Sequence, residues 1–251
     1  MPAPVALQLY SVREYAQEDF EAAVRRVAEI GYAGVEPAGF PGTTPEKAGQ
    51  LFADLGLAVP SAHVALPLGD EQDEVISTMK AIGCSTIVSG KGPDDFATPS
   101  RIKATCDLFN KANQVARSHG MTFGLHNHWW EYTKVEGRYV YEAMLEYLDP
   151  TIHFEIDTYW VQTAGVDPAK IVEQLGERAP LLHIKDGPCV KDEPMTAVGD
   201  GVVDVPAVVA AGKPVTEWLI VELDRCATDM MEAVARSYSY LVGEGLAQGR
   251  G

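Results

Sequence analysis

The chain is short of positive charge. Its 251 residues include 20 lysines and arginines against 36 aspartates and glutamates, which gives a formal net charge of −16. A surface of this sign repels phosphate backbones, so we expect no nucleic-acid partner. No apolar run reaches the length of a membrane span, and the start Met1-Pro2-Ala3-Pro4 lacks the basic residues of a signal peptide. We therefore expect no membrane association.

Paired cysteine spacing is also missing. The four cysteines are Cys84, Cys106, Cys189 and Cys226, and no two form a C-x-x-C pair. We expect reduced thiols in a cytoplasmic protein rather than a disulfide framework. Neither G-x-G-x-x-G nor a P-loop sequence occurs, so the usual nucleotide-binding motifs are absent.

What the sequence has is a regular alternation of short apolar runs and amphipathic stretches. Phe20, Val24, Val27 and Ile30 recur at helical spacing before Gly31, for example, and predict a helix over 17–30. The predicted strands cover residues 5–11, 34–36, 59–65, 86–90, 121–128, 152–157, 181–186 and 218–224. Further helices are predicted over 46–55, 70–82, 99–119, 139–148, 205–211 and 228–242. One more helix is predicted after Asp167, which would cap it, with Pro168 in its first position.

Eight strands, each followed by a helix, imply parallel strands. The length is the usual size of one (β/α)8 barrel, and no linker separates domains, so we expect a single (β/α)8 barrel domain over residues 1–251. The rival is an open doubly wound sheet, which would fit the alternation but lacks its nucleotide-binding motifs here.

The stretch His126-Asn127-His128 carries two imidazoles at the end of the fifth strand. Side chains in a strand alternate, so both imidazoles should point to the same side. Such a pair is either a metal or proton-transfer site or simply two hydrogen-bonded histidines beside a loop.

Ionisable residues fall at the ends of the other apolar strands as well. In a (β/α)8 barrel these ends converge on one mouth, where active sites form. The residues are Glu36, His63, His126, His128, Asp157, His183, Lys185, Glu222 and Asp224. The last four strands supply His126, Asp157, His183 and Glu222, a set that suits a divalent ion such as Mn, Co, Mg or Zn. The alternative is a ring of salt bridges without metal.

These strand ends resemble a known family. The motifs are His126-Asn127-His128, Asp157-Thr158-Tyr159-Trp160, His183-Ile184-Lys185-Asp186 and Val221-Glu222-Leu223-Asp224. The pattern is similar to the xylose-isomerase-like TIM-barrel superfamily, over nearly the whole chain. That group includes sugar phosphate isomerase/epimerase proteins, ketose 3-epimerases, inosose dehydratases and apurinic endonucleases. The resemblance implies the barrel, whereas the chemistry of such proteins varies.

In the epimerases a Glu-Asp-His-Glu set binds the metal, and its first and last carboxylates exchange the substrate proton. The resemblance maps Asp157, His183 and Glu222 onto the last three positions. His126 replaces the first glutamate, and Trp160 stands where the epimerases commonly carry a substrate-binding histidine. The first departure puts the symmetrical two-carboxylate scheme in doubt.

We therefore expect a divalent-metal-dependent sugar isomerase or epimerase that moves a proton next to a carbonyl through an enediolate-like intermediate. Glu222 is the first candidate base, and His126 or His128 would serve the opposite face. Lys185 would neutralise developing charge, or only form a salt bridge with Asp186 or Asp224. The candidate substrate-binding residues are Glu36, His63, Trp160 and Glu131, of which Glu131 is alternatively a partner of an imidazole or a solvated loop charge.

Three rival functions remain. A dehydratase or lyase acting on a keto-sugar or 3-keto-glycoside would use the same metal and base, with a protonated imidazole donating to the leaving group. A phosphodiesterase or endonuclease needs more ligands and a basic groove, and a non-catalytic sugar-binding barrel needs neither metal nor base. The expected partner is a small carbohydrate, with a homo-oligomer as a possible assembly.

Glu155 lies two residues before Asp157 and should share its side, deeper in the barrel. A buried glutamate needs a partner, and the sequence offers His153 or Lys185.

Overall fold

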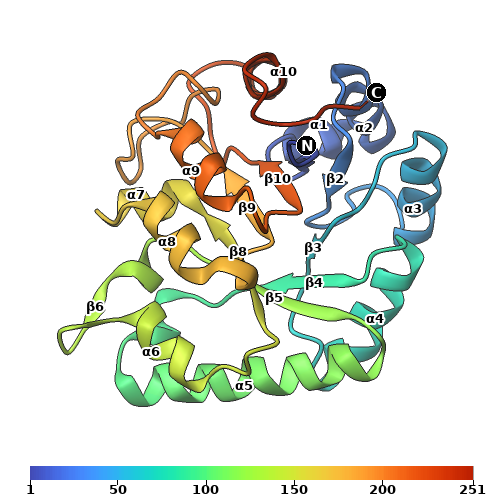
Figure 1. Ribbon diagram of the computed structural model, residues 1–251. Helices are drawn as coiled ribbons and strands as arrows, with labels where there is room; N and C mark the ends of the chain where they lie inside the picture. Colours follow the sequence, from blue (N-terminus) through green and yellow to red (C-terminus); the bar gives the residue numbers. More distant parts are fainter. Residues whose placement is uncertain (251) are drawn as a thin grey trace.

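Eight parallel strands form the centre of the molecule in the computed structural model, which describes residues 1–250 (Figure 1). Their order in the sheet is β2-β1-β10-β9-β8-β5-β4-β3. The strands are β1 (Val5–Gln8), β2 (Gly34–Glu36), β3 (Ala62–His63), β4 (Thr86–Ser89), β5 (Thr122–His126), β8 (His153–Asp157), β9 (Leu181–Ile184) and β10 (Trp218–Val221).

The two outer strands of this order, β2 and β3, also approach each other. The backbone N–H of Val35 donates to Ala58, and that of His63 donates to Pro37, each at 2.9 Å. The sheet is therefore a nearly closed barrel, which confirms the predicted fold class and excludes the open doubly wound sheet.

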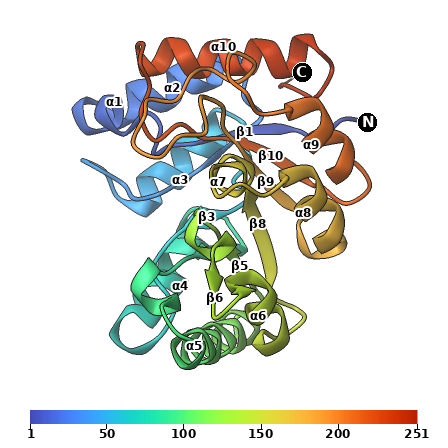
Figure 2. The same cartoon turned by 90° about the vertical axis from the view of Figure 1, so that its left-hand side faces the viewer.

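Helices surround the strands and follow them in sequence (Figure 1). Figure 2 shows α10 along one end of the molecule, beside α1 and α2, with α5 and α6 at the opposite end. The helices are α1 (Arg13–Glu18), α2 (Phe20–Ile30), α3 (Pro45–Asp54), α4 (Gln72–Ala81), α5 (Pro99–Ser118), α6 (Val140–Tyr147), α7 (Thr158–Thr163), α8 (Pro168–Leu175), α9 (Val205–Gly212) and α10 (Met230–Gly243). No helix of residues 1–250 is both long and apolar enough to cross a bilayer.

Local chemistry explains where several helices begin. The Asp167 carboxylate accepts the backbone N–H groups of Ala169 and Lys170 with Pro168 in first position, as predicted. The predicted helix over 17–30 is instead divided at Asp19, whose extended backbone (φ −156°) ends α1 and whose side chain caps α2. The short helix α7 and the hairpin of β6 (Lys134–Val135) and β7 (Arg138–Tyr139) were not predicted.

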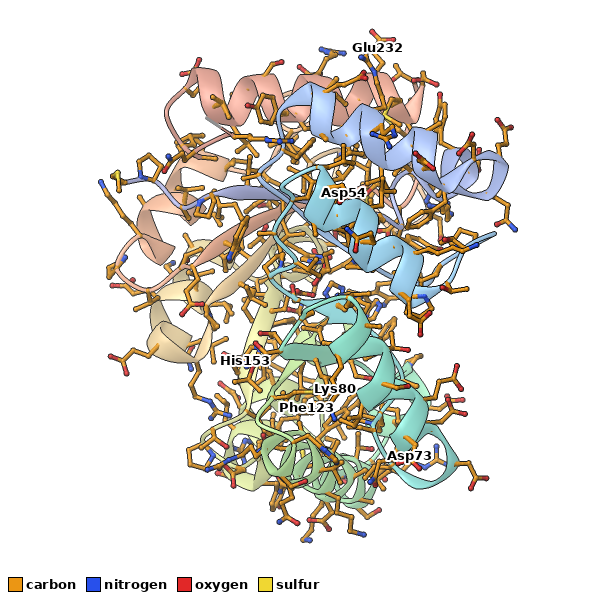
Figure 3. The ribbon with its side chains drawn as sticks, turned by 90° about the vertical axis from the view of Figure 1, so that its right-hand side faces the viewer. Asp54, Asp73, Lys80, Phe123, His153 and Glu232 are labelled. Carbon is orange, nitrogen blue, oxygen red and sulfur yellow. The ribbon has the colours of Figure 1, made fainter. Side chains whose placement is uncertain are left out.

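The strands are buried along their apolar residues, whereas the outer faces of the helices carry charge. Glu232 on α10 and Asp73 on α4 point away from the molecule (Figure 3). Inside, the His153 ring of β8 packs over the backbone of Gly124 on β5. A Cβ at Gly124 would lie 2.2 Å from His153 Nε2, so only glycine fits this close approach.

The long loop after β9 is fastened by one carboxylate. Buried Asp186 accepts the backbone N–H groups of Gly187, Gly199, Gly201 and Val203 at 2.8 to 3.1 Å. Because these donors come from both ends of the loop, Asp186 holds the two ends together.

We predict that Asp186→Asn destabilises the protein by about 2 to 4 kcal/mol, because an amide nitrogen would face two of the four N–H donors. Urea-induced unfolding followed by tryptophan fluorescence measures this change. Asp200→Asn, in the same loop, removes only the exposed ion pair with Arg236 and should cost less than about 1 kcal/mol. Equal losses in the two variants would contradict the role given to Asp186.

Candidate functional site

A cavity of about 690 Å³ opens at the carboxyl ends of the strands. The sequence-predicted residues that line it are His63, His126, His128, Trp160, Lys185, Glu222 and Asp224, and Trp130 joins them. This is the size of a small-molecule site. Both imidazoles of the His126-Asn127-His128 stretch face it, with ring centroids 5.1 Å apart.

Glu155 lies beneath the cavity and contacts three imidazoles. Its Oε2 is 2.5 Å from His63 Nε2, 3.1 Å from His126 Nδ1 and 3.1 Å from His183 Nε2. The partners predicted for Glu155, His153 and Lys185, are therefore wrong. The contacts come from β5 and β9, which pair with β8, and from β3 farther round the barrel, so strand alternation gives the side of Glu155 but not its neighbours.

These contacts turn the other nitrogens of two imidazoles toward two further carboxylates. His126 Nε2 faces Asp157 Oδ2 at 3.7 Å, and His183 Nδ1 lies 2.8 Å from Glu222 Oε2. One ligand atom from each of His126, Asp157, His183 and Glu222 lies within 4.8 Å of the others. A second group of this kind, His63, His126, Glu155 and His183, has its carboxylate oxygen already engaged by all three imidazoles. The first group is the better metal candidate.

Asp157 divides its two carboxylate oxygens between structure and site. Oδ1 accepts the Trp160 N–H and so caps α7, while Oδ2 faces the imidazole. Asn127 fixes the strand end, because its side chain accepts the Asp157 N–H and donates to the Asp157 carbonyl. Burial raises the pKa of Asp157 to about 6, against the opposing charge of Lys185.

Lys185 places a cation among three carboxylates. Its Nζ is 2.8 Å from Asp157 Oδ2, 2.6 Å from Glu222 Oε2 and 3.1 Å from Asp224 Oδ2. The predicted salt bridge with Asp224 is present, and the alternative partner Asp186 is occupied by backbone N–H groups instead.

Four imidazoles meet here in different charge states. Burial opposes protonation of His183 and His63, but neighbouring carboxylates hold the pKa of His183 well above its ordinary value and raise that of His63 to about 9. Burial lowers the pKa of His126 well below its ordinary value and, together with Lys185, lowers that of His128 to about 4. The site therefore combines proton donors with proton acceptors.

Residues 24–237 match the sequence profile of the xylose isomerase-like TIM barrel family. The chain belongs to this family. No curated protein matches the sequence.

Solved structures resemble the fold at low sequence identity. A sugar phosphate isomerase/epimerase from Parabacteroides distasonis has a TM-score of 0.81 and 23% identity, over 99% of this chain and 96% of that one. The IOLI protein with a binding zinc atom has a TM-score of 0.73 and 15% identity, over 97% and 99%. The probable 3-DHS dehydratase AsbF from Bacillus anthracis has a TM-score of 0.75 and 13% identity, over 95% and 98%. These structures thus share the barrel while their names point to different reactions.

Two predicted substrate-binding residues lie behind the cavity of this family member. Glu36 is fully buried, accepts from Gln8 at 2.7 Å and contacts His183 Nε2 at 2.7 Å. Glu131 is buried and accepts the backbone N–H of His128 at 2.8 Å. Both carboxylates hold an element of the site. Glu131 contacts the backbone of His128 and not an imidazole, and its burial excludes its reading as a solvated loop charge.

Sequence reasoning missed Gln8 and Asn127 as parts of the site. Gln8 ends β1 and lies opposite Glu36 in the register of β1 and β2, so its polar side chain at a strand end was a usable signal. Asn127 lies between His126 and His128, and the sequence analysis considered only the two histidines. Its hydrogen bond to β8 could not be predicted, because the sequence does not show which strands are neighbours in the sheet.

We predict that Glu131→Gln changes how stability depends on pH. Burial raises the pKa of Glu131 to about 8, so the folded state keeps a proton that the unfolded chain releases near pH 4.3. Between about pH 5 and 8 wild-type stability therefore falls with rising pH, by about 1.4 kcal/mol per unit relative to Glu131→Gln. Urea titrations in chelator across this range measure the difference. The exposed Glu136→Gln variant should show no such slope, and a flat difference for Glu131→Gln would mean an ionised buried carboxylate.

Proposed function

We propose that the protein is a divalent-metal-dependent sugar isomerase or epimerase, with a small carbohydrate as substrate. The observation that carries the proposal is the four-residue ligand group from β5, β8, β9 and β10 at the base of the cavity. Two carboxylates and two imidazole nitrogens suit Zn, Co or Mn, with Mg as a weaker match. His126 is already neutral, whereas His183 would release a proton when the ion binds.

The donor set fits an ion in its chemistry and its support. His126, Asp157, His183 and Glu222 would hold it. Three of them are oriented from behind: His126 and His183 by Glu155, and Asp157 by its cap of α7. A bound divalent ion supplies polarisation of a carbonyl and stabilises negative charge on the adjacent oxygens.

The proton is then moved by side chains that line the cavity. Glu222 faces the cavity as a carboxylate whose pKa is held well below its ordinary value, because Lys185 and His183 outweigh burial. The His128 ring is neutral at pH 7, and its Nδ1 has no hydrogen-bond partner among residues 1–250. We assign Glu222 and His128 to proton transfer, with His126 as ligand and Lys185 as the cation beside the developing charge.

The side chain of His128 is held for this role by an aromatic wall, by which we mean Trp130 and Trp160 at the side of the cavity. Its ring stacks on Trp130, with centroids 4.1 Å apart and planes 11° apart, and the Trp130 indole donates to the Lys91 carbonyl. Trp160 lies in the same wall and lines the cavity. We assign this surface to the face of a sugar ring.

A second candidate function, elimination, is favoured by His63. Its imidazole lines the cavity and is protonated at neutral pH, because Glu36 and Glu155 raise its pKa to about 9. A positioned imidazolium donates a proton to a departing hydroxyl or alkoxide. The chain would then act as a dehydratase or lyase on a keto-sugar or keto-glycoside.

We predict about one tightly bound Mn, Co or Zn ion per chain, measured by elemental analysis of the purified protein. Asp157→Asn should weaken ion binding at least about tenfold. Asp167→Asn is the matched control, because Asp157 and Asp167 both cap a helix and only Asp157 faces the ligand group. Wild-type protein that holds no ion, and whose melting temperature is unchanged by chelator or added Mn, would support the non-catalytic sugar-binding barrel.

We predict that wild-type protein with Mn exchanges the proton next to the carbonyl of a ketose substrate in deuterated water. Mass spectrometry should find deuterium in an isomeric sugar, and Glu222→Gln should slow the exchange about 10²- to 10⁴-fold. Glu217→Gln, exposed at the other end of the same strand, should leave it unchanged. An unsaturated product instead of an isomer would replace isomerisation by elimination.

A further inference from the structure

Lys185 is held unusually deep for a lysine. Its side chain is 1% exposed, and its ammonium lies near the face of Trp160, 5.7 Å from the ring centroid. Lysine is rarely buried to this extent unless its charge is compensated. Here the compensation comes from the same two carboxylates that belong to the ligand group.

Lys185 contacts both of these ligands at ion-pair distance. Nζ lies 2.8 Å from Asp157 Oδ2 and 2.6 Å from Glu222 Oε2, and it also donates a hydrogen bond to Asp224 Oδ2 at 3.1 Å. The first two of these oxygens are the ones that face His126 Nε2 and His183 Nδ1. The ammonium thus lies against the acidic half of the ligand group.

Asp224 provides a second place for the ammonium. Its carboxylate is 27% exposed, lines the cavity and already accepts the Lys185 hydrogen bond. Its own position is fixed from behind, because Arg13 donates to the Asp224 carbonyl at 2.8 Å. Lys185 can therefore leave Asp157 and Glu222 without losing all of its compensation.

We infer that Lys185 is an internal cation that exchanges with the divalent ion. Without metal its ammonium neutralises Asp157 and Glu222; when an ion binds, the two positive charges repel, and the ammonium moves to Asp224 at the cavity. There it stands where negative charge develops on a substrate oxygen. This inference rests on the proposed metal site and adds that a resident ammonium limits the affinity of that site.

The test compares ion binding by wild type, Lys185→Met and Lys91→Met. Methionine keeps the length of the buried side chain and removes the charge. Lys91 lines the same cavity but takes part in no ion pair within residues 1–250, so its variant controls for the loss of one positive charge. Calorimetric titration with Zn at pH 7.5 should give Lys185→Met at least a tenfold lower Kd than wild type, and Lys91→Met less than a threefold change.

Stability in chelator gives a second readout. Lys185→Met should melt at a lower temperature than wild type when metal is absent, and Zn should raise its melting temperature by more than it raises that of wild type. If Lys185→Met does not fold, wild-type protein labelled with ¹³C-lysine still decides the question. Zn should then move one protected lysine Cε resonance, whereas an unchanged spectrum on Zn saturation would overturn the exchange.

The two proposals fail in different ways. Wild-type and Lys185→Met proteins that bind one Zn with equal Kd would overturn the exchange and leave the metal-dependent function standing. If neither protein binds Zn, the metal site itself fails and the exchange fails with it.

Discussion

The contact of Glu155 with three imidazoles is the interaction on which the site depends. A fully buried carboxylate is costly unless its oxygens are compensated, and here one oxygen meets His63, His126 and His183. Each contact fixes which nitrogen of a ring faces the barrel interior. The remaining nitrogens of His126 and His183 therefore point outward, toward the two carboxylates that complete the ligand group.

Negative charge exceeds positive charge at the barrel mouth. Five carboxylates gather around the imidazoles and a single ammonium, namely Glu36, Glu155, Asp157, Glu222 and Asp224. Burial of such a set is tolerated only where cations compensate it. The high pKa of His183 and the buried Lys185 are two responses to this excess. A divalent cation at the proposed metal site would be a third.

The sequence predicted the barrel and the strand ends because both depend on local patterns. Apolar periodicity located all eight barrel strands, and alternation placed Asp157 and Glu155 on one side of β8. It did not predict which side chains meet across the barrel, such as Glu36 with His183, because such contacts depend on the stagger of the strands and on side-chain length. The division of a predicted helix at Asp19 was missed although its signal is local. The apolar spacing begins at Phe20, and the Asp19 cap directly before it was not used to place the start of the helix.

The histidine at position 126 makes better sense once Lys185 is considered. A glutamate there would add a third carboxylate to Asp157 and Glu222, and one ammonium would leave two negative charges buried without metal. With a neutral imidazole at position 126, Lys185 compensates one of the two carboxylates, and one negative charge is left. His183, whose pKa is held well above its ordinary value, lies beside that charge. A neutral imidazole at position 126 and the buried lysine thus belong together. They give a site that is compensated without an ion yet still offers a divalent ion two carboxylates and two imidazoles.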